Sequence, residues 1–334
     1  MKKFFALMLA IALLATMTAC GGNKPADNGD NNAPAETVKF GSAYILNSLA
    51  ATDATEDKNG QGSVDLTAAV ITLDKDGKIV ACDLDTLQIK AAYTTEGKAV
   101  ANAEFKTKGE MGDGYNMVAY GGATQEWYKQ ANAFEALIAG KTVAEIKALV
   151  VADTNKGTDE VVNAGCTIMI NEFVSAIEKA AQNAKDSELT KDASVKVTMA
   201  AEQTCTDATE DKAGSNKVAT TIFAAALKDG KVALASSDCV EIDFTFDLTG
   251  KSTFDATKTV QSKREKGDNY GMVAYAGAAK EWYAQADAFD AACVGKTGAE
   301  IAGLMGEDYK GIDSLKAAGC TIYVTGFVAA ASKI

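Results

Sequence analysis

The sequence predicts an α+β fold built from two tandem copies of one domain, each an antiparallel sheet with helices packed on one face. One observation is a repeat: Gly-Asp-Gly-Tyr-Asn-Met-Val-Ala-Tyr at 112–120 returns as Gly-Asp-Asn-Tyr-Gly-Met-Val-Ala-Tyr at 267–275. The other is the order of segments within each copy. Segments in which apolar and polar residues alternate, as in strands, come before segments whose apolar residues have helical spacing. Units of about 140 residues are large enough to hold a core. We therefore expect self-sufficient domains over 37–182 and 194–334, joined by a linker at 183–193.

Residues 1–20 are typical of an export signal. Lys2 and Lys3 precede an apolar run over 4–15, which is too short for a stable transmembrane anchor. Small residues then lead to Cys20, an arrangement that resembles a bacterial lipoprotein cleavage box. The resemblance implies that Cys20 is lipidated and holds the chain at the extracytoplasmic face of the cell membrane. An ordinary secretory signal with a chance cysteine is the alternative.

The charge and residue content of the chain exclude several classes of function. Residues 21–36 are polar, contain both prolines of the chain and predict a flexible tether. The formal net charge is −12 without a basic stripe, so nucleic acid is not an expected partner. The chain has no histidine, which excludes Ser-His-Asp and Cys-His catalysis and histidine-ligated metals. No Cys-x-x-Cys occurs, so neither a zinc site nor a redox pair is predicted.

Strands are predicted where apolar residues alternate, with an Asp-Gly turn before the last strand of each copy. They are 38–46, 64–73 and 78–84 in the first copy, and 218–227 and 231–235 in the second. The shared loop Thr-Asp-Ala-Thr-Glu-Asp-Lys, at 52–58 and 206–212, lacks the glycine and terminal glutamate of a calcium-binding EF-hand loop. A solvated hairpin loop is the favoured interpretation.

Helical spacing begins at about residue 124 and ends near 139. It places Trp127, Ala131, Phe134 and Ile138 on one face, and the second copy repeats this with Trp282, Ala286, Phe289 and Cys293. Core packing is the favoured role for both tryptophans. The Gly-Lys-Thr at 140–142 and 295–297 predicts a left-handed helix C-cap at Gly140 and Gly295. The last helix of the first copy is expected to begin with Asn171 as N-cap, and that of the second copy with Thr325 or Gly326.

An Asp-Gly-Lys strand turn, followed about ninety residues later by a small-Gly-small-Thr sequence before a helix, resembles the FMN-binding domain of exported electron-transfer lipoproteins. The resemblance implies that a flavin transferase joins FMN through its phosphate to a threonine. The family's Asp-x-x-Ser-Gly-Ala-Thr motif aligns with Ala164-Gly165-Cys166-Thr167 and Ala318-Gly319-Cys320-Thr321. The aspartate of that motif is replaced by Val161 and Leu315, and an aspartate stands two places earlier in each copy.

The candidate site therefore has two parts. A glycine turn lets the backbone approach a phosphate, and the threonine supplies the covalent oxygen. An apolar slot with an aromatic or thioether wall holds the ring. The candidates for the turn are Gly165, Cys166, Thr167, Gly319, Cys320 and Thr321, and those for the wall are Tyr115, Met117, Tyr120, Tyr270, Met272 and Tyr275. The alternative is that Ala-Gly-Cys-Thr is only a tight turn with a core cysteine.

The sequence is compatible with three functions. The leading one is a membrane-anchored flavoprotein that passes electrons outside the membrane, with a flavin transferase and redox proteins as partners. The second is a non-catalytic surface lipoprotein whose tandem domains bind a small ligand or a cell-envelope partner without flavin. The third, a secreted hydrolase, has little support because no carboxylate pair can be assigned from the sequence.

Overall fold

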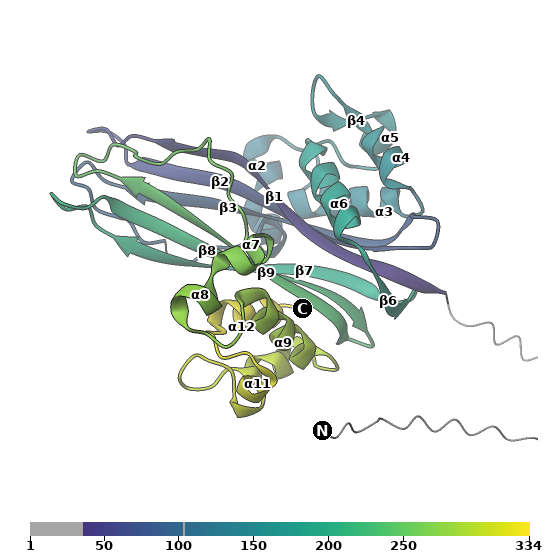
Figure 1. The fold of residues 1–334 in the computed structure, drawn as a ribbon. Helices are drawn as coiled ribbons and strands as arrows, with labels where there is room; N and C mark the ends of the chain where they lie inside the picture. Colours follow the sequence, from purple (N-terminus) through teal and green to yellow (C-terminus); the bar gives the residue numbers. More distant parts are fainter. Residues whose placement is uncertain (1–35, 103) are drawn as a thin grey trace, which may run out of the picture. The chain divides into compact units, whose positions relative to one another are not determined.

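The computed structural model describes residues 36–102 and 104–334 (Figure 1). The predicted signal peptide, the lipidation residue Cys20 and nearly all of the predicted tether lie outside the described residues. Within the described ranges, no helix is both long and apolar enough to cross a membrane. The six cysteines of this part of the chain are all free thiols.

The strands of the first copy are β1 (Thr37–Thr52), β2 (Gly60–Leu73), β3 (Ile79–Tyr93), the short pair β4 (Val150–Val151) and β5 (Lys156–Gly157), and β6 (Lys185–Thr190). Those of the second copy are β7 (Ser194–Thr206), β8 (Gly214–Lys228) and β9 (Lys231–Phe246). The larger sheets have the orders β3-β2-β1-β6 and β7-β8-β9, and every pairing in them is antiparallel.

The helices of the first copy are α1 (Lys108–Met111), η1 (Gly112–Tyr115), α2 (Met117–Gly121), α3 (Trp127–Ile138), α4 (Val143–Lys147), α5 (Asp159–Asn163) and α6 (Asn171–Asn183). Those of the second copy are α7 (Lys263–Lys266), η2 (Gly267–Tyr270), α8 (Met272–Ala276), α9 (Trp282–Cys293), α10 (Gly298–Ile301), η3 (Ala302–Leu304), α11 (Asp313–Ala318) and α12 (Thr325–Ala331). The predicted α+β fold is confirmed in both copies.

Each sheet carries its helices on one face and the sheet of the other copy on the opposite face (Figure 1). Alternation along β2 shows the division, because successive side chains of a strand point to opposite faces. Leu66 and Val70 pack into the cluster between the sheets, whereas Ile71 and Leu73 pack under the helices of the first copy. The fold therefore has four layers, in the order helices, sheet, sheet and helices.

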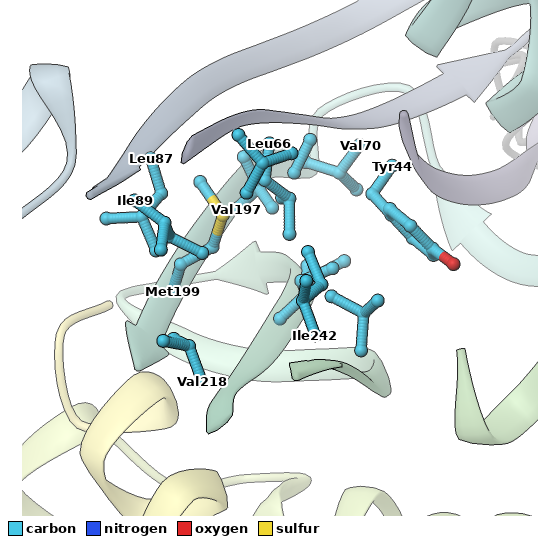
Figure 2. Close-up of a cluster of buried hydrophobic side chains, with 14 of the residues drawn as sticks. Tyr44, Leu66, Val70, Leu87, Ile89, Val197, Met199, Val218 and Ile242 are labelled. Atoms are coloured by element: carbon cyan, nitrogen blue, oxygen red, sulfur yellow. The ribbon is translucent and has the colours of Figure 1, made fainter. Parts of the chain in front are cut away.

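One core joins the copies, which differs from the expectation of two self-sufficient domains. It combines buried side chains of both sheets, among them Leu66 and Leu87 of the first copy with Val197, Met199 and Ile242 of the second (Figure 2). The segment expected to be a linker at 183–193 contains β6, which pairs with β1. Because neither sheet buries its inner face without the other, the copies stabilise each other.

Two ion pairs at equivalent positions tie the copies together at their edges. Lys179 of α6 reaches Glu265 of α7 with an Nζ–Oε1 distance of 2.6 Å. Lys333, just after α12, reaches Glu110 of α1 at the same distance. Each glutamate also completes the capping box of its own helix. The last helix of each copy is thus fixed to the first helix of the other copy.

The helix ends predicted from the sequence are confirmed only in part. Gly140 and Gly295 have φ of 78° and 79°, which confirms their predicted left-handed conformation, but the C-caps of α3 and α9 are the preceding residues, Ala139 and Val294. The predicted N-caps of the last helices are wrong. Ile170 and Val324 occupy the cap positions, one residue before Asn171 and Thr325, and neither makes a side-chain cap hydrogen bond.

Removing a buried side chain from the shared core should weaken both copies together. Met199→Ala is expected to lower the free energy of unfolding by about 2 to 5 kcal/mol, because it opens a cavity that residues of both copies line. The chain has two tryptophans, Trp127 in one copy and Trp282 in the other. Urea unfolding followed by fluorescence in Trp282→Phe and Trp127→Phe backgrounds therefore reports the copies separately. An unchanged midpoint for the first copy would contradict the shared core.

Candidate functional site

The Ala-Gly-Cys-Thr sequence forms a tight turn after α5 and after α11. Gly165 and Gly319 both have a φ of 106°, a backbone conformation that side chains other than glycine rarely adopt. Cys166 and Cys320 are fully buried, and burial raises the pKa of each thiol to about 11. These two cysteines therefore act as small core residues of the turn.

The threonine that follows is held by a buried glutamine from the first long helix of its copy. Oε1 of Gln130 accepts hydrogen bonds from the Thr167 backbone N and Oγ1, at 2.8 and 2.9 Å. Gln285 holds Thr321 in the same way, at 2.9 and 3.0 Å. Both glutamines are almost completely buried, so the turn has a fixed position against the helix.

The two threonines differ in exposure and in their charged surroundings. Thr167 is half-buried, whereas Thr321 is exposed. Lys280 lies directly over the turn of the second copy. Its Nζ is 2.2 Å from the position that a Cβ atom on Gly319 would occupy. In the first copy the equivalent neighbour of Gly165 is the neutral amide of Gln125. The turn of the second copy thus combines an exposed threonine with a nearby ammonium group.

A lysine between two aromatic rings forms the next part of the site in each copy. Nζ of Lys108 lies 5.4 Å from the ring centroid of Tyr115 and 5.8 Å from that of Trp127. In the second copy, Nζ of Lys263 lies 5.3 Å from Tyr270 and 5.7 Å from the Trp282 ring. These distances are typical of cation–π contacts. Both lysine side chains are largely buried.

A buried aspartate positions each lysine-bearing helix. Asp85 of β3 accepts hydrogen bonds from Thr107 Oγ1 and from the Gly109 backbone N. Asp238 of β9 accepts the equivalent bonds from Ser262 and Arg264. Burial raises the pKa of Asp85 to about 6, although its hydrogen bonds oppose the shift. These aspartates hold α1 and α7 against the sheet edges.

A glutamate fixes the methionine segment of each copy. Glu126 accepts hydrogen bonds from the backbone N of Met117 and Val118, and Glu281 does the same for Met272 and Val273. In the second copy the Met272 sulfur lies 4.0 Å from Nε2 of Gln285, the residue that holds Thr321. The segment is therefore linked to the threonine turn through one glutamine.

A cavity of about 350 Å³ lies beside these groups in the second copy. Its walls include Tyr270, Met272, Trp282, Lys263 and Ile322, the residue directly after Thr321. The predicted wall residues Tyr270 and Met272 line this cavity, whereas the predicted turn residues Gly319, Cys320 and Thr321 do not. Trp282 serves both as a core residue, as predicted, and as a cavity wall.

Two of the expected wall residues lie elsewhere. Tyr120 and Tyr275 are 88% and 91% exposed, because α2 and α8 turn their last residues to solvent. In the first copy Tyr115, Met117 and Ile168 pack against the helix-side core. Val161 and Leu315, which stand where the flavin-attachment motif has aspartate, are buried core residues.

The sequence interpretation missed the glutamines and lysines of the site. Gln130 and Gln285 stand on the apolar face of their helices, beside Ala131 and Ala286, and are repeated in both copies. A polar side chain inside an apolar stripe is the signal that identifies them, because such a group needs a hydrogen-bond partner. Lys108 and Lys263 gave no comparable signal.

Fold and site together define a tandem α+β protein whose second copy has a cavity near a glycine turn, walled by aromatic, thioether and charged side chains. No family model matches the chain, and no solved structure matches it either. A 108-residue stretch is 32% identical to the chlorophenol reductase of Desulfitobacterium hafniense, covering 28% of this chain and 33% of that protein. The chain thus spans about a third of the length of the curated relative it matches, and part of it is similar to a reductase.

Loss of the glutamine acceptor should loosen the turn. Gln285→Leu is expected to lower the free energy of unfolding by about 1 to 3 kcal/mol, since it leaves the Thr321 backbone N–H without its acceptor. Thr321→Val removes the hydroxyl bond alone and should cost about 1 kcal/mol or less. Chemical denaturation measures both. Equal effects of the two substitutions would show that the backbone bond is unimportant.

Proposed function

We propose that this chain is a flavin-carrying electron-transfer protein, with FMN attached through its phosphate to Thr321 and, in the first copy, to Thr167. The cavity between Tyr270, Met272 and Trp282 carries the proposal, because it opens beside the residue that follows Thr321. The partial similarity to a reductase supports a redox role.

The residues of the second copy fit an FMN group in three respects. The cavity volume lies within the range of about 300 to 1,000 Å³ that small-molecule sites occupy. The acceptor hydroxyl belongs to an exposed residue. Lys280 supplies a positive charge at the turn, which a phosphate needs in a chain of formal net charge −12. The first copy has the neutral Gln125 in place of Lys280, so we expect the second copy to bind the phosphate of FMN more tightly.

A bound flavin would supply one- and two-electron transfer. The protein's own groups prepare the cavity for it. Burial alone would lower the pKa of Lys263, but Cys239, Glu241 and Tyr270 outweigh burial and raise it, so the ammonium keeps its proton. Trp282 and Phe327 line the same cavity and exclude water from its apolar side. Because this ammonium also pairs with Glu241, at an Nζ–Oε1 distance of 3.2 Å, it would serve the flavin as a hydrogen-bond donor beside the aromatic wall.

We also propose that the protein is exported and held at the membrane through a lipid on Cys20. Only the sequence supports this step, through the basic and apolar start of the chain and the small residues before the cysteine. A flavin transferase and extracytoplasmic redox proteins would then be its partners. The polar residues 21–36 would give the anchored protein reach from the membrane surface.

Covalent flavin should be visible on a denaturing gel. After co-expression with a flavin transferase, the wild-type band is expected to fluoresce under ultraviolet light, to lose at least half of its signal in Thr321→Ala, and to go dark when Thr167→Ala is added. Thr325→Ala is the matched control, since Thr325 lines the same cavity but lies in α12. A dark wild-type band would contradict the proposal and favour a flavin-free binding protein.

Lipidation should depend on Cys20 alone. Metabolic labelling with a radioactive fatty acid is expected to mark the wild-type protein and to leave Cys20→Ala unlabelled and released from the membrane fraction. Cys205→Ala, which removes an exposed thiol of the folded part, should keep the label. Labelling that survives in Cys20→Ala would overturn the anchor assignment.

A further inference from the structure

The two copies differ at one position of their last helices, next to the 350 Å³ cavity of the second copy. Glu172 is the second residue of α6, and the equivalent second residue of α12 is Gly326. Gly326 lines the cavity, together with the following residue, Phe327. The same helix position thus carries a long acidic side chain in the first copy and no side chain in the second.

Strand register identifies the residues of the first copy that match the cavity walls of the second. Asp85 and Asp238 hold the equivalent helices α1 and α7, and they are paired with Ala68 and Ile222 on the neighbouring strands. This alignment relates four residues of the first copy to four cavity-lining residues of the second. Asn47, Asp65, Thr67 and Lys108 correspond in this order to Glu202, Ala219, Thr221 and Lys263.

The carboxylate of Glu172 lies among these four residues of the first copy. Glu172 stands one helical turn before the fully buried Ala176, so its half-buried side chain is directed toward the sheet. Burial and the neighbouring Asp65 raise the pKa of its carboxyl group, and the groups that oppose this shift are Lys108, Asn47 and Thr67. Glu172 therefore occupies the space that is equivalent to the cavity of the second copy.

The second copy has no room for a side chain at the same helix position. A Cβ atom on Gly326 would lie 2.5 Å from Oγ1 of Thr221, which is closer than such atoms approach in folded proteins. Thr221 and Gly326 both line the cavity. A side chain here would have to displace Thr221 and take up part of the cavity.

We propose that this helix position decides which copy encloses a flavin ring: Gly326 leaves the cavity of the second copy free to hold the ring, whereas Glu172 fills the equivalent space of the first. The identity of the ring rests on the proposed function. The threonine turn and the ring cavity are then separate requirements. An FMN on Thr321 packs its ring beside Trp282, while an FMN attached to Thr167 has its ring outside the fold.

Lumiflavin, which is the flavin ring without the ribityl chain and phosphate, tests the cavity apart from the covalent link. Equilibrium dialysis against the purified full-length protein, produced without a flavin transferase, measures how many molecules bind to each chain. We expect one bound lumiflavin in wild type and two in Glu172→Ala. Binding to Gly326→Glu should be at least tenfold weaker, and the double variant Glu172→Ala/Gly326→Glu should again bind one.

Matched controls separate the cavity from other effects of these substitutions. Glu178→Ala removes a carboxylate from the same helix, where Glu178 pairs with Lys147 at the surface, and should leave one lumiflavin per chain. Gly303→Glu adds a glutamate to the second copy at a glycine whose Cβ would meet no atom within 4 Å, and should also leave one. Circular dichroism and urea midpoints close to those of wild type confirm folding. If Gly326→Glu is not folded, the comparison of wild type with Glu172→Ala decides.

The possible results separate this inference from the proposed function. No saturable lumiflavin binding, two molecules per wild-type chain, or an unchanged stoichiometry in Glu172→Ala would overturn the inference. A dark band on the denaturing gel with one lumiflavin per wild-type chain and two in Glu172→Ala would remove the covalent link and support the role of this helix position. A fluorescent band with lumiflavin binding unaffected by either substitution would support the proposed function and overturn that role.

Discussion

The packing of one sheet against the other is the constraint on which the rest of this structure depends. Once the inner faces of the two sheets are buried together, the helices of each copy have only the outer faces left to cover. The threonine turns follow the helices, so their buried cysteines belong to the two outer cores and not to the shared one. Each copy therefore presents its own turn, while neither has a core independent of the other.

The threonine turn is held by hydrogen bonds and sterics together. A glycine with a φ of 106° makes the turn, and the buried glutamine fixes the next threonine against the long helix. For the flavin proposed at the second copy, this fixed geometry would lower the cost of binding. The replacement of Gln125 by Lys280 then changes the charge at the turn without changing its backbone, as the shared φ shows.

Local features could be predicted from the sequence because they depend on neighbouring residues. The Asp76-Gly77 turn, the apolar faces of α3 and α9 and the left-handed Gly140 follow from spacing and glycine chemistry. The joining of the copies was missed, although continuous apolar runs such as 68–71 and 222–226 indicate strands buried on both faces. Tyr120 and Tyr275 were misplaced because the spacing of a glycine-rich segment does not fix the direction of its side chains. A cavity of about 850 Å³ between the copies could not be predicted, because it depends on residues that differ between them. Gly41 lines this cavity, whereas the matching strand position of the second copy holds Lys196, and only the strand pairing shows that these two positions correspond.

The most direct test of the functional account is peptide mass mapping of protein co-expressed with a flavin transferase. Trypsin is expected to release residues 317–333, which contain Thr321 and no internal lysine or arginine. The account predicts that this peptide carries the added mass of FMN and that fragmentation places it on Thr321. An unmodified peptide, in a preparation where a known substrate of the same transferase is fully loaded, would contradict it.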